Sequence, residues 1–297
     1  MFNLLKLSDF DTDYINYLLD KSQQCAQGTY DNSCASKTMI NCFFEPSTRT
    51  HYSFQMAQHK LGCNVINFYP EDSSILKGET FYDTIMVFDS YKPDGLVIRS
   101  KENGYYNELI GKVHCPMLNA GDGTQDHPTQ SLLDLLTIKQ EFNKFDGLKI
   151  AIVGDIKHSR VAHTNIEVMQ RLNMDTYISG PKEFKDTRYK YIDFEEALKE
   201  MDIIMLLRVQ HERHEEKMKL TTSEYHEKYG LTLERVSKMK KNSIIMHPAP
   251  FNRGTEIADE VVECEKSRIF KQMSNGVYVR MAVCHEAIYG DKKWVIF

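Results

Sequence analysis

The residues that follow one apolar stretch of the sequence could hold a phosphate group. The stretch KTMINCFF leads into residues 45–50 (EPSTRT), where Ser47, Thr48, Arg49 and Thr50 place three hydroxyls and one guanidinium in consecutive positions. If this segment opens a helix, the backbone N–H groups of the first turn add further donors toward an anion. An ordinary helix cap uses a single Ser or Thr, so a purely structural cap explains the segment less well.

Three more polar side chains of the first half could act beside this segment. Arg99 ends the apolar stretch DGLVIR, where its guanidinium could reach the same anion. His127 and Gln130 belong to an HPTQ segment whose proline suits the first turn of a helix. A neutral imidazole and a carboxamide would hydrogen-bond a carbonyl or an amide group. Taken alone, Arg99 would be a common surface arginine, and a capping or packing role would be favoured for His127.

The second half also carries guanidinium groups where apolar stretches end. LKIAIVGD is followed by Arg160 and not by the glycines of a dinucleotide-binding turn, which weakens a dehydrogenase interpretation. DIIMLLR ends at Arg208, with Gln210 shortly after, and IIMHPAP supplies a further strand end followed by a rigid Pro-Ala-Pro. Guanidinium forks suit carboxylates and phosphates, so each half could hold one part of an anionic ligand.

The charged segment 210–219 (QHERHEEKMK) raises the question of a metal site. His211 and His214 have a spacing that metal ligands use on a helix, but no third ligand stands near them. A solvated loop or helix face is therefore the favoured interpretation of this segment.

The sequence around these side chains predicts strands and helices that alternate along the chain. Apolar runs predict strands at 37–44, 63–69, 94–99, 148–155, 174–180 and 202–208. Helical periodicity predicts helices at 12–28, 50–61, 78–91, 128–142, 159–173 and 193–200. Such alternation is typical of parallel sheets covered by helices, so we expect an α/β fold with two domains joined by the long helix after Pro128.

Length and composition agree with a folded chain of two domains. The chain has 297 residues, which suits two domains of about 150 residues and a cleft between them. Hydrophobic residues make up 41% and charged residues 27%, so disordered, collagen-like and coiled-coil classes are disfavoured. The net charge of -5 gives no general attraction to nucleic acid or to a membrane surface.

The cysteines and the first residues bear on the compartment. Seven cysteines, none in a CxxC pair, disfavour a disulfide framework and a zinc ribbon. The opening MFNLLKLSDFDTDYINYLL lacks the basic and uninterrupted apolar regions of a signal peptide. No apolar run reaches the length of a membrane span. A cytoplasmic location is the simplest expectation.

Seven separated motifs, taken together, strongly resemble the catalytic chains of the aspartate carbamoyltransferase family. The resemblance covers about residues 37 to 283, and the motifs follow the family's order: FFEPSTRT (43–50), KGET (77–80), VIR (97–99), NAGDG (119–123), HPTQSLLD (127–134), LRVQ (207–210) and HPAPFNRGTEI (247–257). Ornithine carbamoyltransferases share the STRT and HPxQ motifs, but look different in the second domain, where HCLP stands in place of HPAP.

The resemblance implies a division of the chain by substrate. Residues 1–133, with about 276–297 packing back onto them, would bind carbamoyl phosphate, and residues 134–275 would bind aspartate. The implied carbamoyl phosphate ligands are Ser47, Thr48, Arg49, Thr50, Arg99, His127, Gln130, Ala249 and Pro250. The implied aspartate ligands are Lys77, Arg160, Arg208 and Gln210, and the implied catalytic residues are Arg49, Thr50, Lys77, Arg99 and His127.

Two further expectations follow from the resemblance. Ser73 and Lys77 would lie on a loop that enters the neighbouring subunit's site, which implies a homotrimer with shared active sites and leaves regulatory chains open as partners. The implied reaction makes N-carbamoyl-L-aspartate and phosphate, an early step of de novo pyrimidine biosynthesis, and needs no metal, redox cofactor or protein nucleophile.

Three residues depart from the family pattern, and two rival functions stay open. His51 replaces the usual Arg or Lys, Gln55 the usual Glu, and Asp126 the usual Gln. A carboxylate facing the phosphate would weaken binding, so we expect Asp126 to point away or to pair with a cation. The rivals are a carbamoyltransferase for another amine, such as ornithine, and a non-catalytic relative that binds ligands.

Overall fold

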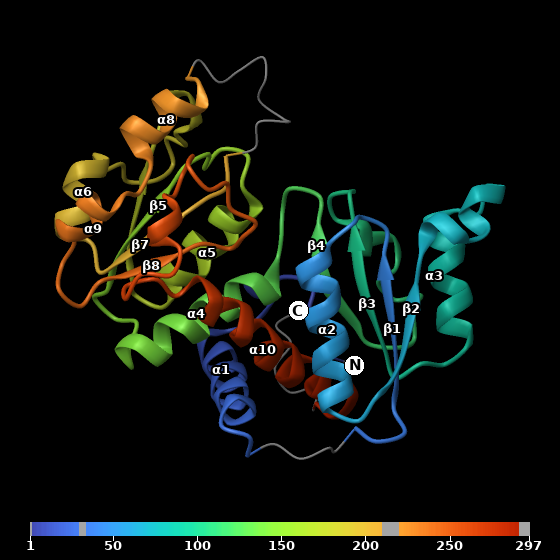
Figure 1. The fold of residues 1–297 in the computed structure, drawn as a ribbon. Helices are drawn as coiled ribbons and strands as arrows, with labels where there is room; N and C mark the ends of the chain where they lie inside the picture. The colour runs from blue at the N-terminus through green and yellow to red at the C-terminus, as the bar shows by residue number, and fades with distance from the viewer. Residues whose placement is uncertain (1, 30–33, 210–219, 291–297) are drawn as a thin grey trace. The chain divides into compact units, whose positions relative to one another are not determined.

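The structure is a computed structural model that describes residues 2–29, 34–209 and 220–290. The chain divides into two compact units (Figure 1). Unit 1 comprises Met1–Leu136 and Met273–Phe297, and unit 2 comprises Thr137–Gln272. Each unit holds a parallel sheet of four strands with helices packed against it, so the predicted α/β fold with two domains is confirmed.

The sheet of unit 1 has the strand order β2-β1-β3-β4. Its strands are β1 (Thr38–Phe43), β2 (Asn64–Phe68), β3 (Gly95–Ser100) and β4 (Met117–Asp122). All three pairings are parallel, so the four carboxyl ends meet at one edge of the sheet. β4 was not predicted, because its sequence MLNAGD contains neither a β-branched residue nor a strand-like alternation.

Helices cover both faces of this sheet. They are α1 (Thr12–Ala26), α2 (Thr48–Lys60) and α3 (Phe81–Ser90), with short 3-10 turns at Leu7–Asp9, Pro70–Asp72, Ser74–Lys77 and Tyr105–Glu108. Successive side chains of β2 show the two faces, because Asn67 bonds to His51 of α2 whereas Phe68 makes an edge-to-face contact with Phe88 of α3.

Unit 2 repeats this arrangement with the strand order β6-β5-β7-β8. Its strands are β5 (Lys149–Val153), β6 (Asp175–Ser179), β7 (Ile203–Leu206) and β8 (Ile244–Met246). Its helices are α5 (Arg160–Arg171), α6 (Phe194–Glu200), α8 (Thr222–Tyr229) and α9 (Leu233–Ser237), with 3-10 turns at Lys182–Phe184 and Asp259–Val261. A core of buried apolar side chains from β5, β7, α6 and the segment after β8 holds the unit together.

Two long helices cross the division between the units. α4 (Pro128–Phe142) agrees with the predicted middle helix, whereas α10 (Ile269–Tyr289) was not predicted. Within unit 1, α10 packs beside α1, because Tyr14 and Lys21 of α1 both contact Glu286 of α10. Arg280 and Glu286 are buried polar residues on α10, and they interrupt the one-sided apolar pattern from which a helix is usually predicted.

The cysteines agree with the expectation of no disulfide framework, since each of the seven is a thiol and six are buried. In the described ranges, no helix has both the length and the apolar composition that crossing a membrane would require.

Candidate active site

The predicted phosphate segment forms the start of α2. Ser47 occupies the N-cap position but makes no capping hydrogen bond, and the first turn carries no acidic side chain. Thr48 and Arg49 are exposed, whereas Thr50 is buried. The helix begins earlier than the predicted position 50, so its positive N-terminal end lies within the STRT segment. A structural cap alone does not account for this geometry, and an anion would meet it favourably.

Arg99 lies beside this helix start. It is paired in register with Phe43 at the carboxyl end of β1, and the N–H of Phe44 donates to its carbonyl at 2.9 Å. Its guanidinium is buried, with Nη1 donating to the carbonyl of Ala120 at 3.0 Å and Nη2 at 2.8 Å from Oε2 of Glu45. Parallel pairing of β1, β3 and β4 thus brings a fixed cation to the residues that precede the STRT segment.

His127 and Gln130 lie at the start of α4, after β4. The carbonyl of His127 accepts the N–H groups of Gln130 and Ser131, at 3.0 and 3.2 Å, so His127 directly precedes the helix. Both side chains are buried, and Nε2 of Gln130 donates to Oδ1 of Asp134 at 3.0 Å. The strand order therefore brings the STRT segment, Arg99 and the HPTQ segment to one edge of the unit 1 sheet.

The segment that follows β2 carries the two residues predicted to act in a neighbouring subunit. Ser73 caps the 3-10 turn Ser74–Lys77, accepting from the N–H of Ile75 at 3.3 Å and donating to the carbonyl of Pro70 at 2.8 Å. Lys77 ends this turn and is exposed. The hydroxyl of Ser73 thus stabilises its own loop, while the ammonium group of Lys77 faces solvent.

In unit 2 the predicted arginines lie at neighbouring strand ends. Arg160 is the first residue of α5, after β5, and Arg208 follows β7, which is paired with β5. Both side chains are partly exposed. Two guanidinium groups at one edge of a parallel sheet suit the carboxylates of a small dianion.

Ala249 and Pro250 follow β8, which lies next to β7. Their turn holds Ala249 at a φ of 52°, a left-handed conformation that is unusual for alanine. The N–H of Ala249 donates to Nδ1 of His247 at 2.9 Å. The backbone of this turn therefore lies at the same sheet edge as Arg160 and Arg208. Gln210, His211 and His214 lie outside the described residues.

Two residues that the sequence analysis missed support the unit 1 site. Glu45 is the carboxylate that contacts Arg99, although it stands within the predicted segment. Arg280 of α10 is buried, with Nη2 donating to Oγ1 of Thr129 at 3.3 Å and its guanidinium lying 5.1 Å from the ring centre of Phe54. Burial lowers the pKa of Arg280 to about 9. Its signal in the sequence is an arginine within the apolar run GVYVRMAVC.

Arg280 joins the two helices on which the unit 1 residues lie. Thr129 belongs to α4, between His127 and Gln130, and Phe54 lies one turn after Thr50 in α2. The guanidinium group therefore contacts both α2 and α4 near their N-terminal ends. Its charge adds to the positive potential of the unit 1 edge.

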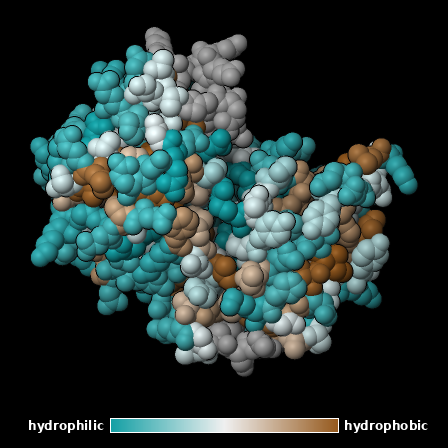
Figure 2. All heavy atoms as spheres, in the orientation of Figure 1, coloured by the Kyte–Doolittle hydropathy of each residue, from teal (hydrophilic) through white to brown (hydrophobic). Residues whose placement is uncertain are grey.

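The surface of the molecule mixes hydrophilic and apolar side chains. Figure 2 shows hydrophilic side chains over much of one face, interrupted by apolar groups on unit 1 and on unit 2. In chemical terms, the unit 1 edge offers donors and cations for a phosphate group, and the unit 2 edge offers guanidinium groups for carboxylates.

Comparisons with known families and structures identify the class of protein. Residues 3–140 match the model described as aspartate/ornithine carbamoyltransferase, carbamoyl-P binding domain. Residues 146–286 match the model described as aspartate/ornithine carbamoyltransferase, Asp/Orn binding domain. The two matches follow the order of the two units.

Solved structures of similar proteins cover nearly the whole chain. The catalytic subunit of M. jannaschii aspartate transcarbamoylase is 31% identical, with a TM-score of 0.86, covering 99% of this chain and 100% of that one. Aspartate transcarbamoylase from Trypanosoma cruzi with N-(phosphonacetyl)-L-aspartic acid is 30% identical, with a TM-score of 0.85, covering 95% and 94%. The same T. cruzi enzyme with carbamoyl phosphate and aspartate is also 30% identical, with a TM-score of 0.85, covering 95% of this chain and 95% of that one. The chain belongs to the aspartate/ornithine carbamoyltransferase family.

Proposed function

We propose that this protein is an aspartate carbamoyltransferase, which transfers the carbamoyl group of carbamoyl phosphate to L-aspartate and releases phosphate. The observation that carries the choice of aspartate is the pair Arg160 and Arg208, which lie at neighbouring strand ends in the unit that matches an Asp/Orn binding domain. Guanidinium groups attract the side-chain carboxylate of aspartate, whereas they would repel the ammonium group of ornithine.

The proposed binding sites divide between two domains. Residues 1–133, with 276–297, would form the carbamoyl phosphate domain, and residues 134–275 the aspartate domain. Ser47, Thr48, Arg49 and Thr50 would bind the phosphate, as the uncapped start of α2 supports. The carbamoyl end would be bound by Arg99, His127, Gln130 and the backbone of Ala249 and Pro250. Arg160, Arg208, Gln210 and Lys77 would bind aspartate.

The proposed reaction depends on positioning and on electrostatics. The uncharged amine of aspartate attacks the carbamoyl carbon, and the carbonyl oxygen gains negative charge. Thr50, Arg99 and His127 would stabilise that oxyanion. The carbon–oxygen bond to phosphate then breaks, and the leaving phosphate takes up the amine proton. Holding both reactants in place would supply part of the ~7–11 kcal/mol that positioning can contribute.

We also infer that the active protein is a homotrimer whose sites take Lys77 and Ser73 from a neighbouring subunit. Seven of the thirteen large apolar residues that are exposed among the described residues fall between positions 52 and 91 of unit 1. They lie on α2, the edge strand β2 and the loop after it, and on or directly after α3: Tyr52, Met56, Ile66, Tyr69, Leu76, Val87 and Tyr91. A concentration of this kind at a sheet edge supports a contact with a second copy of the chain.

The cellular setting is likewise a proposal. A cytoplasmic enzyme without a cofactor would supply N-carbamoyl-L-aspartate to pyrimidine biosynthesis. The presence of seven thiols and no disulfide supports a reducing compartment.

An assay of the purified protein with carbamoyl phosphate and either amine tests the function directly. We expect a ureido product with L-aspartate and none with L-ornithine. A product from ornithine alone would support the other carbamoyltransferase, and absence of turnover at millimolar substrate by folded protein would support a non-catalytic relative. Arg208→Ala should raise the aspartate KM at least 30-fold, while Arg171→Ala, an arginine on the far part of α5 that pairs with Glu167, should leave it unchanged.

A further inference from the structure

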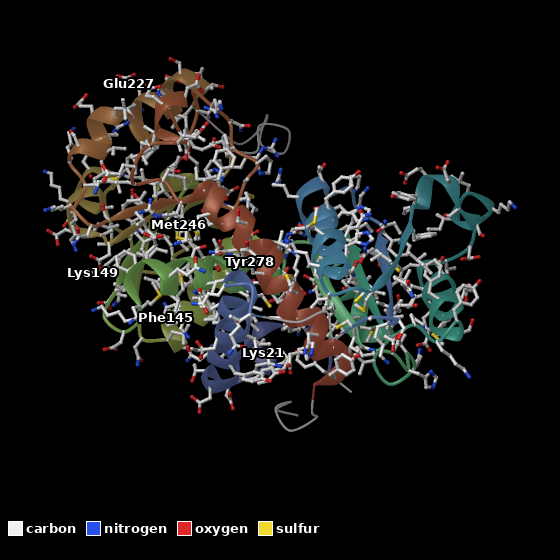
Figure 3. All side chains as sticks on the ribbon, turned by 60° about the horizontal axis from the view of Figure 1, so that its bottom comes forward. Lys21, Phe145, Lys149, Glu227, Met246 and Tyr278 are labelled. Atoms are coloured by element: carbon white, nitrogen blue, oxygen red, sulfur yellow. The ribbon has the colours of Figure 1, made fainter. Side chains whose placement is uncertain are left out.

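Glu256 is a buried carboxylate in unit 2 that contacts two of the segments proposed to bind the substrates. Its side chain is 2% exposed and that of His247 is 0% exposed, with Nε2 of His247 3.2 Å from Oε1 of Glu256. His247 directly follows Met246, which is labelled in Figure 3 and ends β8. Such a buried pair requires a full set of hydrogen bonds to be stable.

The hydrogen bonds of His247 define which ring nitrogen carries the proton. Nδ1 accepts the N–H of Ala249 at 2.9 Å, so the proton of the neutral ring is on Nε2, which donates to Glu256. The N–H of His247 itself donates to Oε1 of Gln272 at 2.9 Å. The imidazole therefore connects the carboxylate of Glu256 to the backbone of Ala249.

Glu256 also holds the rest of the turn and the segment after β7. Its Oε1 accepts the N–H of Asn252 at 2.6 Å, and its Oε2 accepts the N–H of Val209 at 3.4 Å. Nδ2 of Asn252 donates to the carbonyl of Val209 at 2.8 Å, which ties the two segments together a second time. Val209 is the residue after Arg208, so one carboxylate connects the carbamoyl-binding turn to the aspartate-binding strand end.

The left-handed conformation of Ala249 explains why such support is needed. A non-glycine residue at a φ of 52° is disfavoured and persists only where surrounding contacts hold it. The bond from Ala249 to His247, and through His247 to Glu256, supplies such a contact.

We propose that Glu256 is a positioning residue for the reaction, which acts through His247 on the Ala249–Pro250 turn and through Val209 on Arg208. This inference rests on the proposed function, since it assigns the contact with His247 to carbamoyl phosphate binding and the contact with Val209 to aspartate binding. The contacts to His247 and to Val209 can be broken separately, because His247 bonds to Oε1 of Glu256 and Val209 bonds to Oε2.

Kinetics of the full chain with three variants tests the proposal. Glu256→Gln keeps an acceptor for His247 and Asn252, but places an N–H donor against the N–H of Val209. We expect the aspartate KM to rise at least fivefold and the carbamoyl phosphate KM to stay within twofold. His247→Leu removes the acceptor for Ala249 and should raise the carbamoyl phosphate KM at least fivefold. His247→Asn restores that acceptor but not the Nε2–H donor to Glu256, so its carbamoyl phosphate KM should stay at least threefold above wild type.

Controls separate this role from loss of stability and from failure of the proposed function. Glu260→Gln, at an exposed glutamate of the same segment, should match wild type in both KM values. A purely structural role would lower Tm and the active fraction while both KM values stay unchanged or shift equally in Glu256→Gln and His247→Leu, and that result would overturn the proposal. If Glu256→Gln does not fold, His247→Asn decides alone, because a carbamoyl phosphate KM within twofold of wild type without the bond to Glu256 would overturn the proposal. Wild-type protein that makes no N-carbamoyl-L-aspartate would refute the function itself.

Discussion

The guanidinium of Arg99 lies 2.8 Å from the carboxylate of Glu45, which precedes the STRT segment by one proline. A dianionic substrate bound at the start of α2 would compete with Glu45 for this cation. Removing only Arg99 would leave the carboxylate of Glu45, which is 18% exposed, beside the phosphate. The ion pair therefore fixes the position of the Arg99 guanidinium. It also means that loss of Arg99 leaves a negative charge close to the substrate.

A double-mutant cycle tests this relationship. We expect Arg99→Ala to raise the carbamoyl phosphate KM at least 100-fold, because loss of one partner of a buried charge pair costs roughly 2–5 kcal/mol of binding free energy. Adding Glu45→Gln should recover at least threefold of that loss, because the remaining carboxylate no longer repels the substrate. Steady-state kinetics measures both values, and two effects that simply add would show that the residues do not interact in binding.

Asp126 should have little effect on phosphate binding. Its N–H donates to Oδ1 of Asp122 at 2.7 Å, and its charge raises the pKa of Tyr106, after the larger effects of burial and of Asp122. The carboxylate is thus within electrostatic range of a core tyrosine. We expect Asp126→Gln to lower the carbamoyl phosphate KM less than tenfold. A carboxylate aimed at the phosphate from about 7 Å would cost ~2 kcal/mol, so a larger change would contradict this placement.

Lys77 should act in the site of a neighbouring subunit. Lys77→Ala and Arg99→Ala should each be nearly inactive, whereas trimers assembled from a mixture of the two should regain about a quarter of wild-type activity, because one mixed site in four contains both intact residues. The measurement is the specific activity after mixing unfolded chains and refolding them. Mixed trimers as inactive as the separate variants would show that Lys77 acts within its own subunit.

His51 should position the phosphate helix through a hydrogen bond. Its Nε2 lies 2.9 Å from Oδ1 of Asn67, which also accepts from Nδ2 of Asn41 at 2.9 Å, so the imidazole is the donor. Its ring stacks on Phe43 at 4.5 Å. His51→Leu removes the donor and should raise the carbamoyl phosphate KM about fivefold and cost ~1 kcal/mol of stability. His51→Gln retains a donor and should stay within twofold, and equal effects of the two variants would refute a role for the hydrogen bond.

Glu286 should make the stability of unit 1 depend on acidic pH. Burial of its carboxyl group acts to raise the pKa, but the nearby His285 and the hydrogen bonds from Lys21 and Tyr14 outweigh burial and lower it to about 2, from an ordinary value of 4.5. Because the folded pKa lies below the unfolded one, the stabilisation is present above pH 4.5 and is lost as the pH falls toward 2.

The matching experiment compares melting temperatures at two pH values. Glu286→Gln should lower Tm by about 4–8 °C at pH 7, for a loss of ~2 kcal/mol. At pH 3 the difference from wild type should become much smaller. Glu227→Gln, an exposed glutamate labelled in Figure 3, serves as the control and should leave Tm unchanged at both values. A difference that is equal at pH 7 and pH 3 would exclude the ionised carboxylate as the source of stability.

The features that depend on neighbouring residues were predictable from the sequence alone. The STRT segment, the arginines where apolar stretches end and the alternation of strands with helices are local patterns. Chain geometry converts them directly into helix starts and strand ends at one edge of a sheet. The two-domain fold and the family were therefore predictable, as was the anion chemistry of the candidate residues.

Contacts between residues far apart in the chain became visible in the folded protein. Glu45 contacts Arg99 because β1 pairs with β3, and Arg280 lies behind Thr129 because α10 packs beside the start of α4. Glu256 joins His247 to Val209 because β7 and β8 are neighbours in their sheet. Such contacts depend on strand order and on the burial of charges far apart in the chain. Local spacing does not encode either property, so the support behind the predicted ligands appeared only in the folded protein.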